Sequence, residues 1–200
     1  FGGAVANPIN TLCSMLAQVI DADGRITIPH FYDDVEEVPA AERDMIAHIP
    51  FDEKKYMEAI GVKALKGEKG YSTLERNSCR PSFDVCGIWG GYTGEGSKTV
   101  LPSKAYAKVS CRLVPHQNHE VISKLFVDYI NSIAPEYVQV KVTPMHGGEG
   151  YVCPISLPAY QAAEKGFTKA FGKKPLAVRR GGSIPIISDF EQILGIKTVL

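Results

Sequence analysis

The stretch Gly87–Pro115, GIWGGYTGEGSKTVLPSKAYAKVSCRLVP, decides the fold of this chain. From Lys104 to Val114 the residues alternate, and small or apolar side chains fall on one side: Ala105, Ala107, Val109, Cys111 and Leu113. This alternation predicts a half-buried strand. Residues 83–89 are β-prone, and four glycines lie between the two segments: Gly90, Gly91, Gly94 and Gly96. A two-residue hairpin turn needs fewer glycines, so we expect a longer loop.

This glycine-rich loop has two interpretations. Its backbone could lie close to a ligand or partner, with Lys98 and Thr99 as polar tips and Arg112 on the open face of the sheet. It could equally be a surface loop beside a solvated arginine. The loop is neither a Walker loop nor a dinucleotide fingerprint, because the GK[ST] ending and the following helix are missing.

Upstream of the hairpin, Asn7 and Pro8 predict a helix start, and apolar residues continue at helical spacing to Ile20. Residues 30–82 are more polar and are interpreted as an insertion of small helices. One helix is expected near Pro39, one between Asp52 and Gly61, and one with a Ser72/Glu75 capping box. The insertion shows no catalytic pattern, and its charges are interpreted as solvated faces.

Downstream of the hairpin, Asn118 is expected to cap a helix that runs to Ile133, and 138–143 alternates like a strand. Strand, helix and strand form a βαβ unit, which crosses over right-handed. The order from Pro8 predicts an α+β fold, a ferredoxin-like split βαβ whose first strand is expected just upstream of Phe1. Because the chain opens on Phe1 and stops within the β-prone run 196–200, we expect part of a longer protein.

The last 45 residues have a different character. A helix is expected from about residue 156 to Gly172, a strand over 173–180 and a second helix over 184–194. Gly181, Gly182 and Ser183 stand between the last two elements. Small residues and free amides there would suit an anion or carboxylate, or Ser183 would simply cap an ordinary turn. This tail is interpreted as part of a separate α/β domain.

Composition excludes some classes of function. Among 200 residues, 22 Lys and Arg balance 22 Asp and Glu, so no net charge favours nucleic acid or an anionic membrane. No apolar run is long enough to span a bilayer. Five widely spaced cysteines indicate a reduced, intracellular protein, and no Cys/His cluster predicts a structural zinc site. Trp89 and Met145 are predicted to fill the core.

Single histidines carry little signal. His116 and His119 flank a helix start and are interpreted as surface residues. His146, in the turn PMHGGEG, is equally compatible with solvent exposure and with ligand binding. We identify no catalytic residue and no metal ligand in the chain.

The segments FGGAVANP, GGYTGEGSKTVLPSKAYAKVSCRLVP and RRGGSIPI, taken together, resemble the dinuclear-zinc peptidases of the carnosinase-like dipeptidase type. Acetylornithine deacetylase and succinyl-diaminopimelate desuccinylase are more distant members. The resemblance implies a lid and dimerisation domain over 1–154, with the insertion at about 30–82, and a truncated start of the returning catalytic α/β domain over 155–200. It also implies a cytoplasmic homodimer that cleaves dipeptides with two zinc ions. The ligands of those ions would lie outside this chain, which alone would be inactive.

The resemblance also implies substrate-binding positions. Thr99 would reach across the dimer toward the neighbouring active site, Arg112 and His146 would hold polar groups of the substrate, and Ser183 with Gly182 would contact its backbone or carboxylate. Arg180 stands where some relatives carry an acid, and its role stays open. A non-catalytic ferredoxin-like module that dimerises or binds a small ligand is the alternative.

Overall fold

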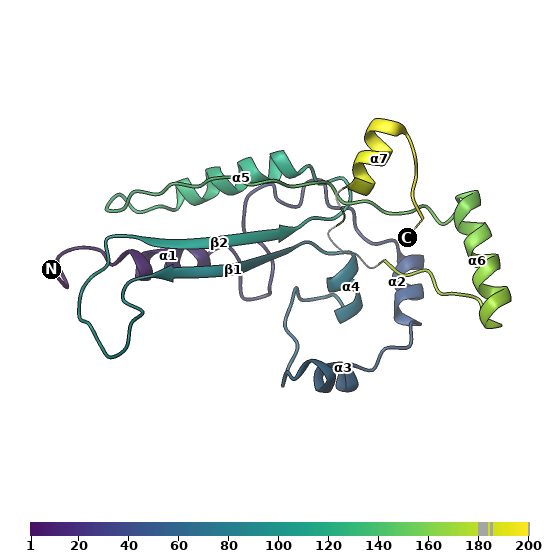
Figure 1. The fold of residues 1–200 in the computed structure, drawn as a ribbon, viewed down its shortest axis with the longest axis horizontal. Helices are drawn as coiled ribbons and strands as arrows, with labels where there is room; N and C mark the ends of the chain where they lie inside the picture. Colours follow the sequence, from purple (N-terminus) through teal and green to yellow (C-terminus); the bar gives the residue numbers. More distant parts are fainter. Residues whose placement is uncertain (180–183, 185, 200) are drawn as a thin grey trace.

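The computed structural model describes residues 1–179, 184 and 186–199. Over this part of the chain the elements are α1 (Pro8–Ala17), α2 (Ala40–Ala47), α3 (Glu53–Ile60), α4 (Thr73–Ser78), β1 (Ser82–Gly90), β2 (Ala105–Arg112), α5 (His119–Ser132), α6 (Pro158–Phe171) and α7 (Ile186–Leu194). The strands form a long hairpin, with α1 behind it and α5 running alongside past the edge of β2 (Figure 1). The predicted mixture of helices and strands is confirmed. None of the helices in these ranges is long and apolar enough to cross a membrane.

The hairpin is antiparallel. Ser82 pairs with Arg112 and Gly90 with Ala105, and a register shift between Val85 and Gly87 leaves an extra residue in β1. The alternating burial predicted for β2 is confirmed along its whole length. We conclude that one face of the hairpin serves the core while the other meets solvent.

Trp89 corrects one prediction, since the residue expected in the core is 47% exposed. It pairs with Tyr106 across the strands, and the two rings stack with their centroids 5.2 Å apart. Tyr106 belongs to the exposed set of β2, so its partner is held on the same open face. Met145, also expected inside, is 72% exposed.

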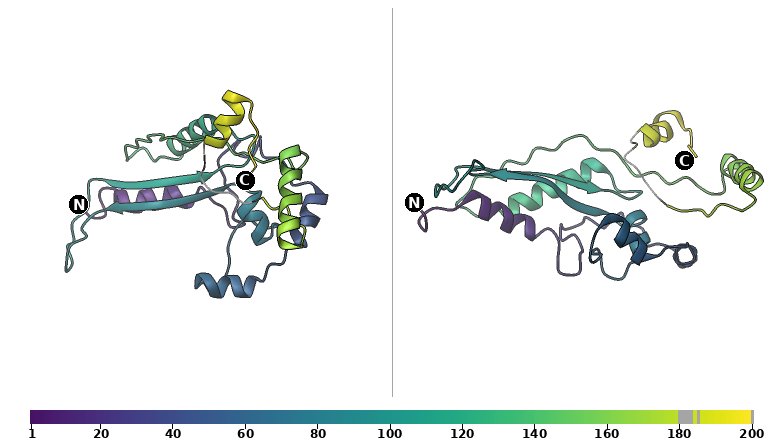
Figure 2. Two further views of the ribbon diagram at one scale, coloured as in Figure 1. Left: turned by 45° about the vertical axis from the view of Figure 1, so that its right-hand side comes forward. Right: turned by 60° about the horizontal axis from the view of Figure 1, so that its bottom comes forward.

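The hydrophobic core lies between the hairpin and the two helices on its covered face (Figure 2). Its buried members are Met15, Val19, Ile26, Ile28, Phe31, Phe83, Ile122 and Ile130. The buried side chain of Gln117 crosses this region: its Nε2 donates to the Phe31 carbonyl at 2.8 Å and its Oε1 accepts from the Val114 amide at 3.0 Å. This amide therefore ties the chain after β2 to the loop that follows α1.

The third predicted strand is not found as a strand. Residues 138–143 alternate in exposure as expected, and Val140 and Val142 pack against the core. The sheet that the structure describes nevertheless has two strands, so no ladder of hydrogen bonds holds this segment. Residues 173–179, also expected as a strand, are irregular. In 138–143 the side chains follow the predicted alternation although the backbone is not paired.

The helices of the insertion begin where their sequence signals predict. Asp52 accepts the Lys55 amide at 3.1 Å at the start of α3, and Gly61 ends that helix in the left-handed region. Ser72 and Glu75 form the complete capping box of α4. Caps depend on contacts between near neighbours in sequence, which is why they could be predicted.

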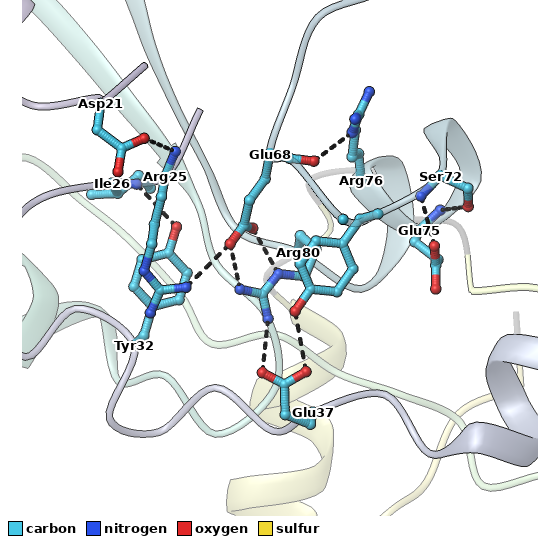
Figure 3. A network of polar contacts seen from close by, with 12 residues as sticks. Asp21, Arg25, Ile26, Tyr32, Glu37, Glu68, Ser72, Glu75, Arg76 and Arg80 are labelled. Atoms are coloured by element: carbon cyan, nitrogen blue, oxygen red, sulfur yellow. Dashed lines mark hydrogen bonds and ion pairs between the residues drawn. The ribbon is translucent and has the colours of Figure 1, made fainter. Parts of the chain in front are cut away.

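The charges of the insertion were expected to be solvated, and for three of them, Glu68, Glu75 and Arg80, this is wrong. Glu68 and Arg80 are 8% and 3% exposed. Arg80 donates from Nε and Nη2 to the two carboxylate oxygens of Glu68 at 2.7 and 2.8 Å. Figure 3 shows the Arg80 guanidinium between Glu68 and Glu37, with Arg25 approaching Glu68 from the far side. Opposite charges from four segments of the chain compensate one another, so burial is tolerated.

Glu75 makes the stability of the insertion depend on pH. Burial of its carboxylate raises its pKa, but hydrogen bonds from Arg43 and the Ser72 amide outweigh burial and hold the pKa below its ordinary value. A depressed pKa in the folded state adds stability above the unfolded pKa, and this stability is lost as pH falls through the folded pKa. We expect Glu75→Gln to lower the free energy of unfolding by about 1–2 kcal/mol at pH 7.

Urea unfolding of the wild type and of Glu75→Gln at pH 7, 5 and 3.5 measures this effect. The difference between the two proteins should shrink toward the lowest pH, where the wild-type carboxylate becomes protonated. Glu58→Gln is the matched control, because Glu58 lies exposed on α3. A difference that stays constant over this pH range would show that the charge of Glu75 contributes nothing.

Candidate functional site

The two ends of the hairpin carry two of the predicted site residues. Arg112 is the last residue of β2; it is exposed and forms no ion pair with any residue in the described ranges. Thr99 is exposed in the loop between the strands. This loop begins at Gly91, whose φ is 70°. β2 spans eight residues, so its ends lie about 23 Å apart at about 3.3 Å per residue. Thr99 belongs to the loop at one end of this strand and Arg112 stands at the other end, so β2 lies between them along the chain.

His146 is exposed at the start of residues 146–150, the predicted turn, which runs as an extended segment against the beginning of α5. A Cβ added at Gly147 would come within 2.6 Å of the His119 ring, and one added at Gly150 within 2.9 Å of the Pro115 nitrogen. Only glycine permits so close an approach. The turn therefore contacts the chain that directly follows Arg112, which brings the segments of two predicted site residues together.

Glu149 fastens this turn to its surroundings. Its Oε1 accepts from Asn118 Nδ2 at 3.1 Å and lies 3.0 Å from His119 Nδ1, and its Oε2 accepts from Gln192 Nε2 of α7 at 3.3 Å. Burial raises the pKa of Glu149, but the hydrogen bonds from His119 and Gln192 bring the pKa below its ordinary value. His119, expected at the surface, is thus half-buried and paired. The only sequence signal for Glu149 is its place within PMHGGEG.

The third predicted part of the site is the Gly-Gly-Ser sequence with the arginine before it. Arg180, Gly182 and Ser183 lie outside the described residues. Immediately before them, Arg179 donates from Nη2 to Glu42 Oε2 of α2 at 2.7 Å and forms a second contact from Nε to Oε1. The insertion therefore contacts the residue that leads into the Gly-Gly-Ser sequence, although it showed no functional pattern.

A hollow of about 540 Å³ lies at the other end of the hairpin, at the base of the glycine-rich loop. Aromatic rings and lysines line it, including Trp89, Tyr92, Lys98 and Tyr106. Within residues 1–179, 184 and 186–199, no three or more His, Cys, Asp or Glu side chains come together in a way that could hold a metal ion. All five cysteines are free.

The structure thus combines a hairpin covered by helices on one face with exposed polar residues at both of its ends. Residues 1–138 match the family model described as a peptidase dimerisation domain. The chain therefore belongs to the peptidase dimerisation domain family. This match confirms the resemblance to M20-type peptidases drawn from the three sequence segments.

Individual relatives agree with the family. The chain is 29% identical over 198 residues to the Cys-Gly metallodipeptidase dug1 of Schizosaccharomyces pombe, a match covering 97% of this chain and 41% of that protein. It is 28% identical over 203 residues to the human beta-Ala-His dipeptidase, covering 100% of this chain and 40% of the relative. The crystal structure of the M20 family metallo-carboxypeptidase Sso-CP2 from Sulfolobus solfataricus superposes with a TM-score of 0.85 at 27% identity, over 96% of this chain and 44% of that one. This chain spans about two fifths of the length of these curated relatives.

Proposed function

We propose that this chain is the lid and dimerisation domain of a homodimeric, cytoplasmic metallodipeptidase, and that each protomer contributes to two active sites. The observation that carries the proposal is the separation of Thr99 and Arg112 by a strand about 23 Å long. A dipeptide spans only about 7 Å when extended. Arg112 and His146 would therefore bind one substrate, while Thr99 would reach the substrate of the partner subunit.

The proposed contacts suit a small zwitterion. A guanidinium such as that of Arg112 can hold a carboxylate with two parallel hydrogen bonds. His146 and the partner's Thr99 would supply donors that orient the scissile carbonyl, and Gly182 with Ser183 would contact the substrate backbone or carboxylate. In support, Arg112, Thr99 and His146 are all exposed and available to a ligand.

The metal centre would lie elsewhere in the protein. The resemblance implies two zinc ions, whereas the described residues offer no cluster that fits such a centre. We therefore assign this chain no step of metal chemistry. Its part in the reaction would be to bind the substrate, to orient it and to join two protomers.

Exposed apolar residues support the proposed division into a lid over 1–154 and a returning catalytic segment over 155–200. α6 buries none of its residues, and Phe167 and Phe171 are 54% and 73% exposed. On α7, Ile193 is 76% exposed. Large apolar side chains exposed in this way, such as the stacked rings of Phe167 and Phe171, suit a surface that other parts of a protein cover, here proposed to be the catalytic domain.

The ferredoxin-like topology is part of the same proposal. Val140 and Val142 of the extended segment 138–143 pack against the core, but within the described residues this segment pairs with no strand and β2 pairs with β1 on one edge only. One further strand between β2 and this segment would satisfy both sets of free backbone groups. It would complete the split βαβ pattern predicted from the sequence.

Complementation between subunits tests the proposed function in the full-length protein. Thr99→Ala and Arg112→Ala homodimers should each hydrolyse dipeptides poorly. In an equal mixture of exchanging subunits, half of the dimers are mixed and each mixed dimer has one intact site, so about a quarter of wild-type activity should return. If no activity returns, both residues serve the same site and the proposed arrangement is wrong.

Metal dependence separates this function from the alternative module. We expect a chelator to abolish dipeptide hydrolysis by the full-length wild type and added zinc to restore it. A full-length protein that contains no metal and cleaves no dipeptide would instead support a non-catalytic ferredoxin-like module.

A further inference from the structure

One carboxylate links three separate parts of the described chain. Glu149 receives one hydrogen bond from Asn118, lies within hydrogen-bonding distance of His119 at the start of α5, and receives another hydrogen bond from Gln192 on α7. The Asn118 side chain has no freedom to turn, because its Oδ1 caps α5 by accepting two backbone amides at 3.0 Å each. Its Nδ2 is consequently directed at Glu149.

The three linked parts are those next to the proposed substrate contacts. α5 begins shortly after Arg112, Glu149 follows His146 by three residues, and α7 begins three residues after Ser183. We infer that Glu149 is a positioning residue that holds the His146 turn in register with the start of α5 and with α7. This inference rests on the function proposed above.

Within the turn 146–150, Glu149 is the one side chain with a hydrogen bond to the rest of the described structure. Gly147 and Gly150 contribute no side chains, and they pack closely against His119 of α5 and against the chain before α5. Packing fixes the distance of the turn from α5, but it provides no directional contact. The directional contacts come from Glu149 alone.

The chemistry of this site requires a carboxylate. Three donors converge on it, and an ionised carboxylate accepts without donating. A glutamine at position 149 would keep the shape but would turn an NH₂ group toward at least one of these donors. The side chains of Glu149 and His119 are 22% and 28% exposed, so water can replace a lost partner only in part. Loss of the charge should therefore loosen the turn without unfolding the domain.

The experiment uses the full-length protein with the variant Glu149→Gln. For a dipeptide substrate we expect KM to rise ~10-fold and kcat to fall less, because substrate placement is disturbed more than chemistry. Hydrogen exchange should become faster in residues 144–150 and, at the same time, in α7. Glu136→Gln, which changes an exposed carboxylate just after α5, is the matched control and should alter neither quantity.

A second variant keeps the test decisive if Glu149→Gln folds poorly. Gln192→Leu removes only the α7 contact of an exposed residue, and it should accelerate exchange in 144–150 as well as in α7. Wild-type KM in folded Glu149→Gln, or exchange confined to α7 in Gln192→Leu, would overturn the inference. Wild-type protein without dipeptidase activity would instead refute the proposed function, and the exchange measurements would still show whether Glu149 links the segments.

Discussion

Arg112→Ala in the full-length protein should lower kcat/KM for dipeptide hydrolysis by ~30-fold or more, which corresponds to about 2 kcal/mol of lost binding in the transition state. In the proposed function this variant loses a charge-assisted contact of two parallel hydrogen bonds to the substrate carboxylate. Arg112 is exposed and makes no ion pair in the described part of the chain, so no internal ion pair is lost with it. Steady-state kinetics on a dipeptide measures the effect, and thermal unfolding should be unchanged.

Two companion variants separate this role from a general effect of charge. Lys108→Ala removes a positive charge from the same exposed face of β2, and should leave kcat/KM near the wild-type value. Arg112→Lys keeps the charge but not the planar fork, and should recover only part of the lost activity. Equal losses in Lys108→Ala and Arg112→Ala would mean that the face acts only through its overall charge.

Arg80→Met should destabilise the protein by about 3–5 kcal/mol, because it leaves the carboxylate of Glu68 buried without its principal partner. The Arg80 guanidinium donates to both oxygens of Glu68 and lies 4.3 Å from the centre of the Tyr71 ring. Methionine fills much of the space but compensates no charge. Urea unfolding monitored by circular dichroism measures the loss.

The double variant Glu68→Leu/Arg80→Met provides the sharper comparison. Removing both charges should recover much of the stability lost in Arg80→Met, since an uncompensated buried charge costs more than an apolar pair. Arg25→Ala removes the half-exposed second partner of Glu68, 3.3 Å away, and should cost less than about 1 kcal/mol. If the double variant is no more stable than Arg80→Met, the isolated carboxylate is not the cause of the loss.

Sequence reasoning predicted the parts of this fold that depend on near neighbours. The caps at Asn7, Asp52, Ser72 and Asn118 all form, because each needs only amides two or three residues away. The alternation of β2 was equally clear. Sequence reasoning failed where burial depends on partners beyond the nearest neighbours. Arg80 was interpreted as solvated, yet Glu68, twelve residues away, and the Tyr71 ring of the same insertion bury it.

The candidate site shows the same limit. Arg112, His146 and Thr99 were identified by the family resemblance. Their local sequence alone left their roles open. Glu149 was missed because its importance arises only when α5, the glycine turn and α7 come together. The contact of Glu42 with Arg179 joins residues 137 positions apart, and no periodicity could have indicated it.

The length of the hairpin sets the distance between its two ends. Because β1 and β2 connect Arg112 to the loop that carries Thr99, their residue count would set how far one subunit extends toward the next in the proposed dimer. Adding two residues to each strand would preserve which side chains face the core, yet it would displace the tip by about 7 Å. We therefore expect enzymes built on this plan to tolerate changes in the sequence of the two strands far better than changes in their length.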